Sequence, residues 1–495
     1  MMLNELMKDI AVRRVVRPSR RKLDVQGLTQ DSRRVEKDFL FVAIPGEAQD
    51  GHDFVPDAVK RGAAAVVVSR DTGAQVPQFV VADPRAALAD LSARFYGEPT
   101  LAMRVAGVTG TNGKTSVTYL VESILKAAGR SPAVLGTVNY RYGAQIFAAP
   151  HTTPESVDLQ ALFARMLEAG VTDVVMEISS HALAMERVRG VHLDVAAFTN
   201  LTQDHLDYHR SLEEYFAAKK SLFTKFLKAS RKTSRTAVVN VDDPRGKKLA
   251  EGLKGALAPV KLSIDGPADL YCKKYEMSEE GIEADIDAGG VSLPIKSPLI
   301  GLHNLQNILV AVGTARGLGV ESGAISKGVA ALANVPGRLE RIANKKGLHV
   351  FVDYAHTPDA VARVCMTLKE FASKKGARLI TVFGCGGDRD RTKRPIMGRE
   401  AGRFSDVVVV TSDNPRTESP EAIIDEILPG LKDAKLPDDR IHRIVSREEA
   451  IKKAVSLAKR GDFVLVAGKG HEDYQIVGKT KTYFSDQEIL RGLMK

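Results

Sequence analysis

Apolar residues follow two alternating patterns along this chain. Short, nearly continuous runs of Val, Ile, Leu, Ala and Phe occur at 63–69, 171–178, 195–199, 348–354, 379–383, 407–411 and 463–467. Runs of this length are typical of strands that are buried on both faces of a sheet. Longer segments with helical spacing stand between them, and several begin at a recognisable cap, as in Asp83-Pro84 and Ser211-Leu212-Glu213-Glu214. This alternation predicts an α/β protein with parallel sheets.

The order of these elements divides the 495 residues into three units, since a chain of this length exceeds a single core. Residues 1–100 predict a small N-terminal α/β domain. Residues 101–335 predict a central, doubly wound parallel sheet, with one of its helices capped by Thr153 ahead of Pro154. A Pro-Gly pair at 336–337 is typical of a hinge between domains, and for residues 336–495 we predict a Rossmann-like C-terminal domain.

The stretch GVTGTNGKTS at 107–116 joins a predicted strand to a predicted helix. Glycines there let backbone N–H groups surround a phosphate, and a helix N-terminus adds partial positive charge. Lys114 can reach the outer phosphates, and the Thr115 hydroxyl can hold Mg²⁺. The general nucleotide-binding pattern has glycine at position 108, whereas this chain has Val108 and places Gly107 one residue earlier. The loop is therefore a variant of the common phosphate cradle.

Composition narrows the classes of function. Apolar residues make up 44% and charged residues 27%, which is typical of a globular protein. No apolar run reaches 18 residues and the N-terminus lacks the apolar core of a signal peptide, so we expect a cytoplasmic protein that does not bind membranes. Lys and Arg exceed Asp and Glu by ten (71 minus 61), but no basic stripe interleaved with aromatic residues occurs. This favours small anionic substrates over nucleic acid. The three cysteines are widely spaced, as expected of buried thiols.

Polar clusters follow several predicted strands, where open parallel sheets bind their ligands. Glu177 closes one strand of the central unit, and a polar loop with two acids and two histidines at 204–209 follows another. Taken alone, Glu177 fits a Mg²⁺ ligand and a strand-end carboxylate bonded to a helix cap equally well, and Lys219 fits an exposed helix lysine. In the third unit, four strands end in polar clusters, at 353–358, 384–390, 413–416 and 468–473. We expect these four to form one site.

Taken together, the segments resemble the Mur ligases, ATP-dependent amide-forming enzymes of bacterial cell-wall synthesis. The resemblance covers essentially the whole chain in order, and it accounts for the position of Gly107, since the family loop reads G-x-T-G-T-N-G-K-T. It implies an N-terminal domain for a UDP-linked precursor, a central ATP-binding domain and a C-terminal ligase domain for the incoming amino acid. Within the family, the segments at 31–33, 413–416 and 468–472 resemble members that add the third peptide residue to UDP-N-acetylmuramoyl-L-alanyl-D-glutamate.

The resemblance also implies roles for individual residues, with ATP and Mg²⁺ as cofactors. It assigns ATP binding to Gly107, Thr109, Gly110, Thr111, Asn112, Gly113, Lys114, Thr115 and Ser116. It assigns catalysis to Lys114, Glu177, His205, Lys219, Asn307, Arg338 and Asp353, and metal binding to Thr115, Glu177, His205 and a carbamate on Lys219. It assigns precursor binding to Gln30, Ser32, Thr152, Thr153, Ser179 and Arg187. It assigns the incoming amino acid to Arg389, Asp413, Asn414, Pro415, Arg416, Gly468 and Glu472.

The choice of amino acid has a physical basis in Arg416. A guanidinium grips a carboxylate with two parallel hydrogen bonds, and Arg389 can join it. Meso-diaminopimelate has a carboxylate at its far end, whereas L-lysine would leave Arg416 facing an ammonium group. We therefore expect the enzyme to add diaminopimelate. We also expect the chain to be a monomer. The alternatives are an L-lysine-adding muramyl ligase, a ligase like folylpolyglutamate synthetase and a non-catalytic nucleotide-binding protein.

Overall fold

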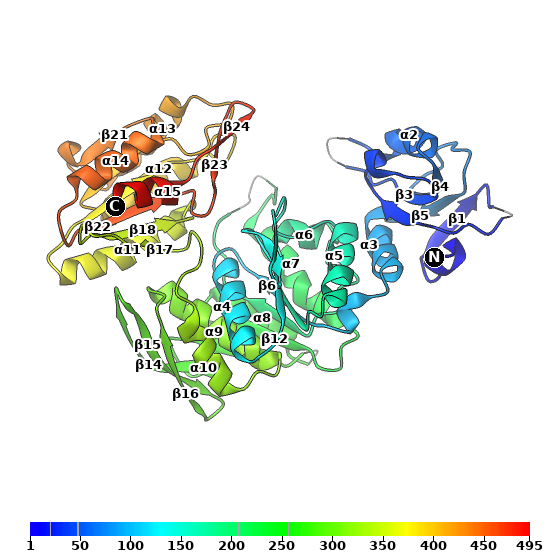
Figure 1. Ribbon diagram of the computed structural model, residues 1–495, viewed down its shortest axis with the longest axis horizontal. Helices are drawn as coiled ribbons and strands as arrows, with labels where there is room; N and C mark the ends of the chain where they lie inside the picture. Colours follow the sequence, from blue (N-terminus) through cyan, green and yellow to red (C-terminus); the bar gives the residue numbers. More distant parts are fainter. Residues whose placement is uncertain (20, 47–48, 205–207, 256) are drawn as a thin grey trace.

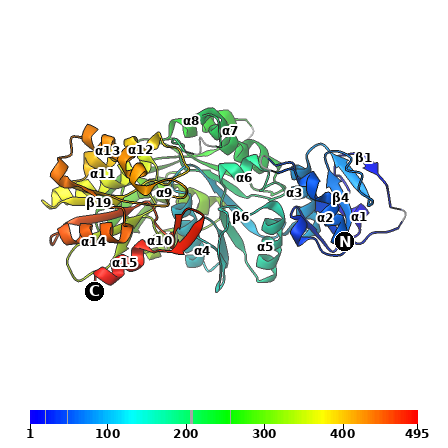
Figure 2. The same ribbon diagram turned by 90° about the horizontal axis from the view of Figure 1, so that it is seen from above.

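The computed structural model describes residues 1–19, 21–46, 49–204, 208–255 and 257–495. It has three α/β units in chain order along its longest axis, seen in Figure 1 as a blue N-terminal unit, a cyan-to-green central unit and a yellow-to-red C-terminal unit. The view from above in Figure 2 shows the same row of three, with the central unit between the other two. Within the described ranges, no helix combines the length and apolar character needed to cross a bilayer.

The N-terminal unit is a five-stranded sheet in the order β1-β5-β4-β3-β2, with β1 the antiparallel edge strand. Its strands are β1 (Val12–Val16), β2 (Gly27–Thr29), β3 (Phe39–Val42), β4 (Ala63–Val68) and β5 (Gln78–Val81). Its helices are α1 (Leu3–Leu6), α2 (Val55–Lys60) and α3 (Pro84–Phe95). The Asp83 side chain accepts from the N–H groups of Arg85 and Ala86, which confirms it as the cap of α3.

The central unit has eleven strands within the described residues, in the order β16-β15-β14-β13-β12-β11-β6-β10-β7-β8-β9. They are β6 (Arg104–Thr109), β7 (Pro132–Leu135), β8 (Tyr140–Tyr142), β9 (Gln145–Phe147), β10 (Asp173–Glu177), β11 (Val195–Phe198), β12 (Thr236–Asn240), β13 (Val260–Ser263), β14 (Leu270–Ser278), β15 (Gly281–Ala288) and β16 (Ser292–Ser297). The helices are α4 (Lys114–Ala127), α5 (Ser156–Glu168), α6 (Ser180–Ala184), α7 (Leu212–Ser221), α8 (Pro244–Leu253), α9 (Leu302–Gly317) and α10 (Ser322–Ala331).

The strands of this sheet from β14 to β7 are parallel, and helices cover both of their faces. One face packs on α4, α9 and α10, and the other packs on α5 and α8. The predicted parallel, doubly wound sheet is confirmed in this part, and the structure differs from it at both edges, where β15 and β16 at one end and β8 and β9 at the other are antiparallel. Both additions are hairpins, which need no crossover helix.

The C-terminal unit is a six-stranded sheet in the order β17-β18-β22-β19-β20-β21, antiparallel only at β17. Its strands are β17 (Glu340–Ile342), β18 (His349–Asp353), β19 (Leu379–Phe383), β20 (Val407–Val410), β21 (Ile441–Arg443) and β22 (Phe463–Ala467), followed by the hairpin of β23 (Tyr474–Val477) and β24 (Thr480–Tyr483). Its helices are α11 (Pro358–Lys374), α12 (Lys393–Phe404), α13 (Pro420–Asp433), α14 (Arg447–Leu457) and α15 (Asp486–Leu493). Helices again pack on both faces.

Helix caps follow the sequence prediction except at α5. Ser211 accepts from the Glu214 N–H, and the Ser446 hydroxyl accepts from the Glu449 N–H. Thr153, however, does not cap α5, whose cap position is Glu155. The Thr153 hydroxyl donates instead to the main-chain carbonyl of Glu177, at 2.9 Å. The Thr153 side chain, which the local sequence predicts as a helix cap, thus makes a tertiary contact instead.

Candidate active site

The phosphate loop leaves β6 and enters α4 as the sequence predicts. Gly110 and Gly113 have φ angles of 151° and 86°, a region that residues with a Cβ rarely adopt. A Cβ on Gly113 would lie 2.2 Å from the Asn307 side-chain oxygen, so only glycine lets α9 approach the loop this closely. Space is also limited at the strand residue Gly107, where a Cβ would lie 2.4 Å from the Cδ1 end of the Ile178 side chain.

Glu177 is a buried carboxylate at the centre of a hydrogen-bond cluster. Its Oε1 accepts from the Thr115 hydroxyl and from the Thr137 N–H, each at 3.0 Å, and its Oε2 accepts from the Thr137 hydroxyl at 3.0 Å. The strands explain the contact, since β10 lies next to β6 and places Glu177 beside Val108. Glu177 therefore faces the phosphate loop, as expected of a carboxylate that shares a ligand with Thr115.

Two lysines converge on one carbonyl of the phosphate loop. Lys114 Nζ and Lys219 Nζ each donate to the Gly110 carbonyl oxygen at 2.8 Å, and Lys114 also donates to the Thr111 carbonyl at 2.9 Å. Lys219 is only 1% exposed, so the interpretation of an exposed helix lysine is wrong. Burial, aided by the charge of Lys114, lowers the pKa of Lys219 well below its ordinary value, and burial also lowers the pKa of Lys114. Burial beside a second lysine thus favours the neutral form of the Lys219 amine.

The C-terminal unit contributes to the same site. The Arg338 guanidinium lies over the Tyr354 ring and donates to the Thr115 hydroxyl at 3.3 Å. Asp353, buried at the end of β18, accepts from the Leu339 N–H at 2.6 Å and so orients the segment that carries Arg338. Burial raises the pKa of Asp353.

A cavity of about 320 Å³, here called the loop cavity, lies between the two units. Residues predicted for ATP, metal and precursor binding meet in its wall, namely Thr111, Asn112, Gly113, Lys114, Thr115, Thr152, Glu177, Ser179, Arg187 and Arg338. Arg187 donates to the Thr153 carbonyl at 3.0 Å. Gln30 and Ser32 are not in this wall. They belong to the N-terminal unit, where Arg34 in the turn of Ser32 pairs with Asp158 of α5 at 2.9 Å.

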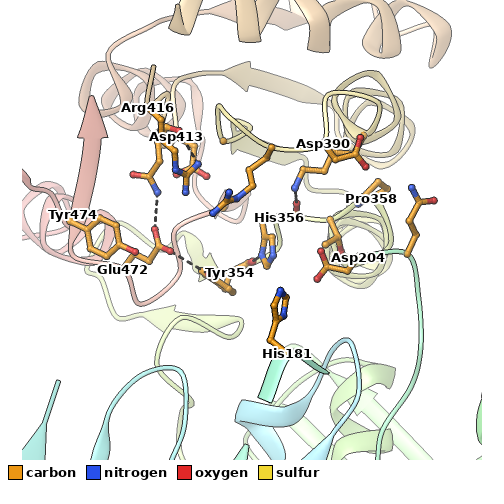
Figure 3. Close-up of a pocket in the computed structure, with 17 residues that line it drawn as sticks. His181, Asp204, Tyr354, His356, Pro358, Asp390, Asp413, Arg416, Glu472 and Tyr474 are labelled. Carbon is orange, nitrogen blue, oxygen red and sulfur yellow. Dashed lines mark hydrogen bonds between the residues drawn. The ribbon is translucent and has the colours of Figure 1, made fainter. Parts of the chain in front are cut away.

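The four polar strand ends of the C-terminal unit meet, as predicted, because β18, β22, β19 and β20 are parallel neighbours. They line a cavity of about 440 Å³, the strand-end cavity, whose side chains are drawn in Figure 3. Arg389, Asp413, Asn414, Arg416, Gly468 and Glu472 all line it. Pro415 lies behind this wall, with its carbonyl against Gly387.

A fixed hydrogen-bond network holds one wall of the strand-end cavity. Asn414 Oδ1 accepts from Lys469 Nζ and the Ile476 N–H, each at 3.0 Å, so its Nδ2 must donate to Glu472, also at 3.0 Å. The Tyr354 hydroxyl donates to the other Glu472 oxygen at 3.3 Å, and dashed lines mark both contacts in Figure 3. Burial and the nearby Asp413 raise the pKa of Glu472. A cationic group placed beside Glu472 would reverse that effect.

Two guanidinium groups reach the same cavity. Arg416 has φ of 51° and donates through Nη1 to the Gly387 carbonyl at 2.7 Å, which anchors its side chain across the strand ends. Arg389 is exposed and donates to its neighbouring carbonyl at Asp388. With Glu472 opposite, the cavity presents both a carboxylate and guanidinium groups, which fits a small zwitterion with charges of both signs.

The side chains around the phosphate loop fit a magnesium ion. Mg²⁺ takes few protein oxygens and completes its shell with water and phosphates. The Thr115 hydroxyl and the Glu177 carboxylate supply such oxygens, and a hydrogen bond of 3.0 Å joins the two groups. No group of three or more His, Cys, Asp and Glu side chains suited to a metal occurs within the described ranges. The predicted ligand His205 lies outside those residues.

Several residues in the two cavities carry no prediction from sequence. Thr137 bonds Glu177, but its segment shows no motif. His181, Asp204, Tyr354 and His356 line both cavities, and each stands in a polar cluster that the strand-end pattern already marks. Lys469 is completely buried and lies 3.2 Å from Asp413. The run Gly468-Lys469-Gly470-His471-Glu472 signals this region, but spacing alone does not say which member points inward.

Comparison with known proteins agrees with this geometry. The profile of the Mur ligase middle domain matches residues 108–315, that of the Mur ligase glutamate ligase domain matches residues 337–470, and that of the Mur ligase family catalytic domain matches residues 24–96. The chain is 47% identical to the UDP-N-acetylmuramoyl-L-alanyl-D-glutamate--2,6-diaminopimelate ligase of Geobacter metallireducens, over 97% of each chain. It is 45% identical to the Gloeobacter violaceus protein of the same name, over 95% of this chain and 94% of that one.

A solved structure of a UDP-N-acetylmuramoyl-L-alanyl-D-glutamate--2,6-diaminopimelate ligase superposes with a TM-score of 0.69 at 33% identity, covering 95% of this chain and 94% of the other. Three α/β units with a phosphate loop opposite a polar cavity define a nucleotide-dependent, multidomain enzyme. With the family matches and the near full-length identity, the chain belongs to the Mur ligase family. It is accordingly an ATP-dependent ligase.

Proposed function

We propose that this enzyme adds meso-diaminopimelate to the D-glutamate γ-carboxylate of UDP-N-acetylmuramoyl-L-alanyl-D-glutamate, a step of peptidoglycan precursor synthesis. The observation that carries the proposal is the shared wall of the loop cavity and the strand-end cavity, since four side chains line both. A phosphate donor at the loop and an amino acid at the strand ends would therefore meet at one point. The relatives of the same name support the choice of substrates.

ATP would bind with its phosphates at the loop between β6 and α4. Backbone N–H groups of the loop would bind phosphate oxygens, and Lys114 would exchange its present partners, the Gly110 and Thr111 carbonyls, for phosphate oxygens. A neighbouring cavity of about 260 Å³, lined by Asn304, Asn334 and Phe351, shares Arg338 with the loop cavity. It offers amide groups and an aromatic ring to the nucleotide base, with Arg338 between base and phosphates.

The precursor would place its γ-carboxylate at the loop cavity, held by Arg187, Ser179 and Thr152, with its UDP end toward Gln30 and Ser32. The carboxylate attacks the γ-phosphorus, which releases ADP and leaves an acyl phosphate. An amine then attacks the acyl carbon and expels phosphate. Two anions must approach each other in the first step, so Lys114 and Arg338 contribute chiefly by offsetting negative charge.

Mg²⁺ would be held by Thr115 and Glu177, with His205 and a carbamate on Lys219 as the further ligands, and would neutralise phosphate charge when bound. The carbamate is supported by the neutral state of the buried Lys219 amine, because only an unprotonated amine adds CO₂. Carbamate formation would also place a negative charge beside the Lys114 ammonium group, and the two would attract each other.

Arg416 and Arg389 would bind the distal carboxylate of diaminopimelate, while Glu472, Asp413 and the Gly468 carbonyl would take the distal ammonium group. The Asn414 amide orients Glu472 for this contact. L-lysine has an ammonium group but no distal carboxylate, so it would leave the guanidinium groups unpaired inside the cavity. The protein would act in the cytoplasm as a monomer.

Phosphate release tests the proposal. The purified chain is given ATP and Mg²⁺ with the UDP-muramyl dipeptide, and then meso-diaminopimelate, L-lysine or L-glutamate. We expect release only when the dipeptide precursor and diaminopimelate are both present. Efficient turnover with L-lysine would replace the substrate assignment, and hydrolysis of ATP without any precursor would overturn the ligase assignment.

A separate experiment addresses the carbamate. Carbon-13 NMR with ¹³C-bicarbonate should show one carbamate signal that is absent from Lys219→Met and present in Lys220→Met, the matched control at the adjacent position. Lys219→Met should also lose turnover. A signal that persists in Lys219→Met, or full turnover by that variant, would exclude the modification at this residue.

A further inference from the structure

The incoming amino acid meets the activated carboxyl group where the loop cavity and the strand-end cavity join. The side chains that line both cavities are those of His181, Asp204, Tyr354 and His356. An amino acid arrives with its amine protonated, and an ammonium group has no lone pair with which to attack a carbonyl. A proton acceptor is therefore needed at this junction, provided by the protein or by solvent.

His356 has the geometry of that acceptor. It stands three residues beyond Asp353, at the end of β18 and before α11, and its Nδ1 lies 2.8 Å from the Tyr354 carbonyl oxygen. A carbonyl only accepts, so this contact requires the proton on Nδ1 and leaves the lone pair on Nε2. Figure 3 shows the His356 ring between Tyr354 and Asp204 and above His181, in the middle of the space that the labelled side chains surround.

Further contacts fix the position of the His356 main chain. Lys393 Nζ donates to the His356 carbonyl at 3.0 Å, and the Thr357 hydroxyl caps α11 by accepting from the Ala360 N–H. Asp359 in the first turn of α11 accepts from the Asn112 amide of the phosphate loop at 3.2 Å. The main chain that carries the ring is thus tied to the phosphate loop from the C-terminal side of the cleft.

The charges around the ring favour its neutral form. Burial lowers the pKa of His356 below its ordinary value, and the cations Lys393 and Arg338 lower it further, whereas Asp204 opposes them. His471 and Asp413 also act on this ring. At neutral pH the imidazole is therefore unprotonated and able to take a proton.

We propose that His356 is the general base that removes a proton from the incoming ammonium group, so that the amine can attack the acyl phosphate. This rests on the proposed function of the site. The nitrogen arrives with three protons and remains in the amide with one. The first proton passes to His356 Nε2 before the carbon–nitrogen bond forms, which frees the nitrogen lone pair, and the second leaves on phosphate as the carbon–oxygen bond breaks. The imidazolium then returns its proton to solvent.

The variant that isolates this step is His356→Asn. An asparagine amide can still donate to the Tyr354 carbonyl from about the position of Nδ1, but it cannot accept a proton. The variant is compared with His442→Asn on the edge strand β21, outside both cavities. Each is given ATP, Mg²⁺, the UDP-muramyl dipeptide and one of two acceptors, meso-diaminopimelate or hydroxylamine. Hydroxylamine is uncharged at neutral pH and needs no base.

We expect His356→Asn to lower kcat with diaminopimelate about 10²- to 10³-fold at pH 7, in the range of general-base catalysis. Hydroxamate formation from hydroxylamine should stay within about twofold of the parent, because acyl phosphate formation is intact. The residual rate with diaminopimelate should rise about tenfold per pH unit, as solvent deprotonates the amine. His442→Asn should match the parent with both acceptors.

Three results would overturn the inference. An equal loss of kcat with both acceptors would place His356 in carboxylate activation or in folding. A rise confined to the KM for diaminopimelate would make it a binding residue. An unchanged kcat would leave it without a role in catalysis. Failure of the proposed function is distinguishable, because the parent enzyme itself would then form no product with the muramyl precursor.

Discussion

At the phosphate loop two lysine side chains, one from α4 and one from α7, bind a carbonyl of the loop, whereas in the strand-end cavity the polar side chains are already bonded to one another. Lys114 and Lys219 share the Gly110 oxygen. Asn414 and Glu472 in the other region have their orientations set by Lys469 and Tyr354. The loop must therefore exchange internal contacts for phosphate, while the strand-end cavity is preorganised.

The two regions should therefore respond differently to substitution, with turnover affected at the loop and amino-acid binding affected in the strand-end cavity. At the loop, Lys114 and Lys219 are buried and their pKa values are lowered, so the fold retains these two amino groups at a cost in stability. In the strand-end cavity, the buried Lys469 pairs with Asp413, so removing it damages both the fold and the site. Four substitutions test the contrast.

The largest effect is expected for Lys114→Met. Without this cation the γ-phosphate loses its nearest positive side chain, and kcat should fall about 10³-fold. Thermal stability should be retained, because methionine fills the same space without a buried charge. Lys126→Met, at the exposed end of the same helix, is the control and should keep parental kcat. A kcat within tenfold of the parent for Lys114→Met would show that the lysine stays on its loop carbonyls during turnover.

A smaller loss should follow Arg416→Lys. Lysine keeps the charge but cannot form two parallel hydrogen bonds to a carboxylate, so the KM for meso-diaminopimelate should rise about 10- to 100-fold. Backbone strain is matched, since neither residue is glycine and φ at this position is 51°. Arg443→Lys on the exposed β21 serves as control. If KM is unchanged while kcat falls, Arg416 acts on the reaction rather than on amino-acid binding.

An effect on both recognition and stability is expected for Lys469→Met. Asn414 Oδ1 loses one of its two donors, so Glu472 is less firmly oriented and the KM for diaminopimelate should rise about tenfold. The buried Asp413 loses its nearest cation, which should cost about 3 kcal/mol of stability. Kinetics and thermal melting measure the two, with the exposed Lys452→Met as reference. A stable variant with parental KM would show that the network is not held by Lys469.

The smallest effect, and one of opposite sign, is expected for the stability of Lys219→Met. The lowered pKa means that the unfolded chain binds a proton at Lys219 that the folded chain does not. The free energy of unfolding of the parent should therefore rise with pH between the lowered pKa of Lys219 in the folded chain and its pKa of about 10.4 in the unfolded chain. Without bicarbonate, Lys219→Met should melt about 2–4 °C higher than the parent at pH 7, and the gap should close toward pH 10. Lys220→Met should show no such convergence, and a gap independent of pH would contradict the neutral amine.

Much of the architecture follows from local sequence signals. The strands 379–383 and 463–467 have the predicted bounds, and Asp83 caps its helix as expected. The antiparallel edges of the central sheet could not be predicted, because the direction of an added hairpin depends on which strands pair and not on the pattern within each strand. The position of the Thr153 side chain could not be predicted for a related reason, since its hydroxyl bonds the distant Glu177 carbonyl.

The site shows the same division. Strand-end clusters are recognisable because parallel neighbours bring their carboxyl ends to one edge, and this placed Asp413, Arg416 and Glu472 together. The role of Thr137 could not be predicted from the sequence, because a single threonine that orients a carboxylate belongs to no motif with a fixed spacing. Lys469 was visible only as a member of a polar run, and its complete burial depends on packing around it.

The hydrogen bond between Asn112 and Asp359 is one of the polar ties across the cleft, together with the Arg338 contact to Thr115 and the ion pair of Lys375 with Glu279. Partly exposed contacts of this kind contribute about 0.5–1 kcal/mol each. These three polar ties together contribute about 2 kcal/mol to the juxtaposition of the two units, in addition to the apolar packing of Ile300 and Met277 of the central unit on the C-terminal core. Substitution of Asp359 should therefore weaken one polar tie and increase the fraction of extended molecules in solution scattering.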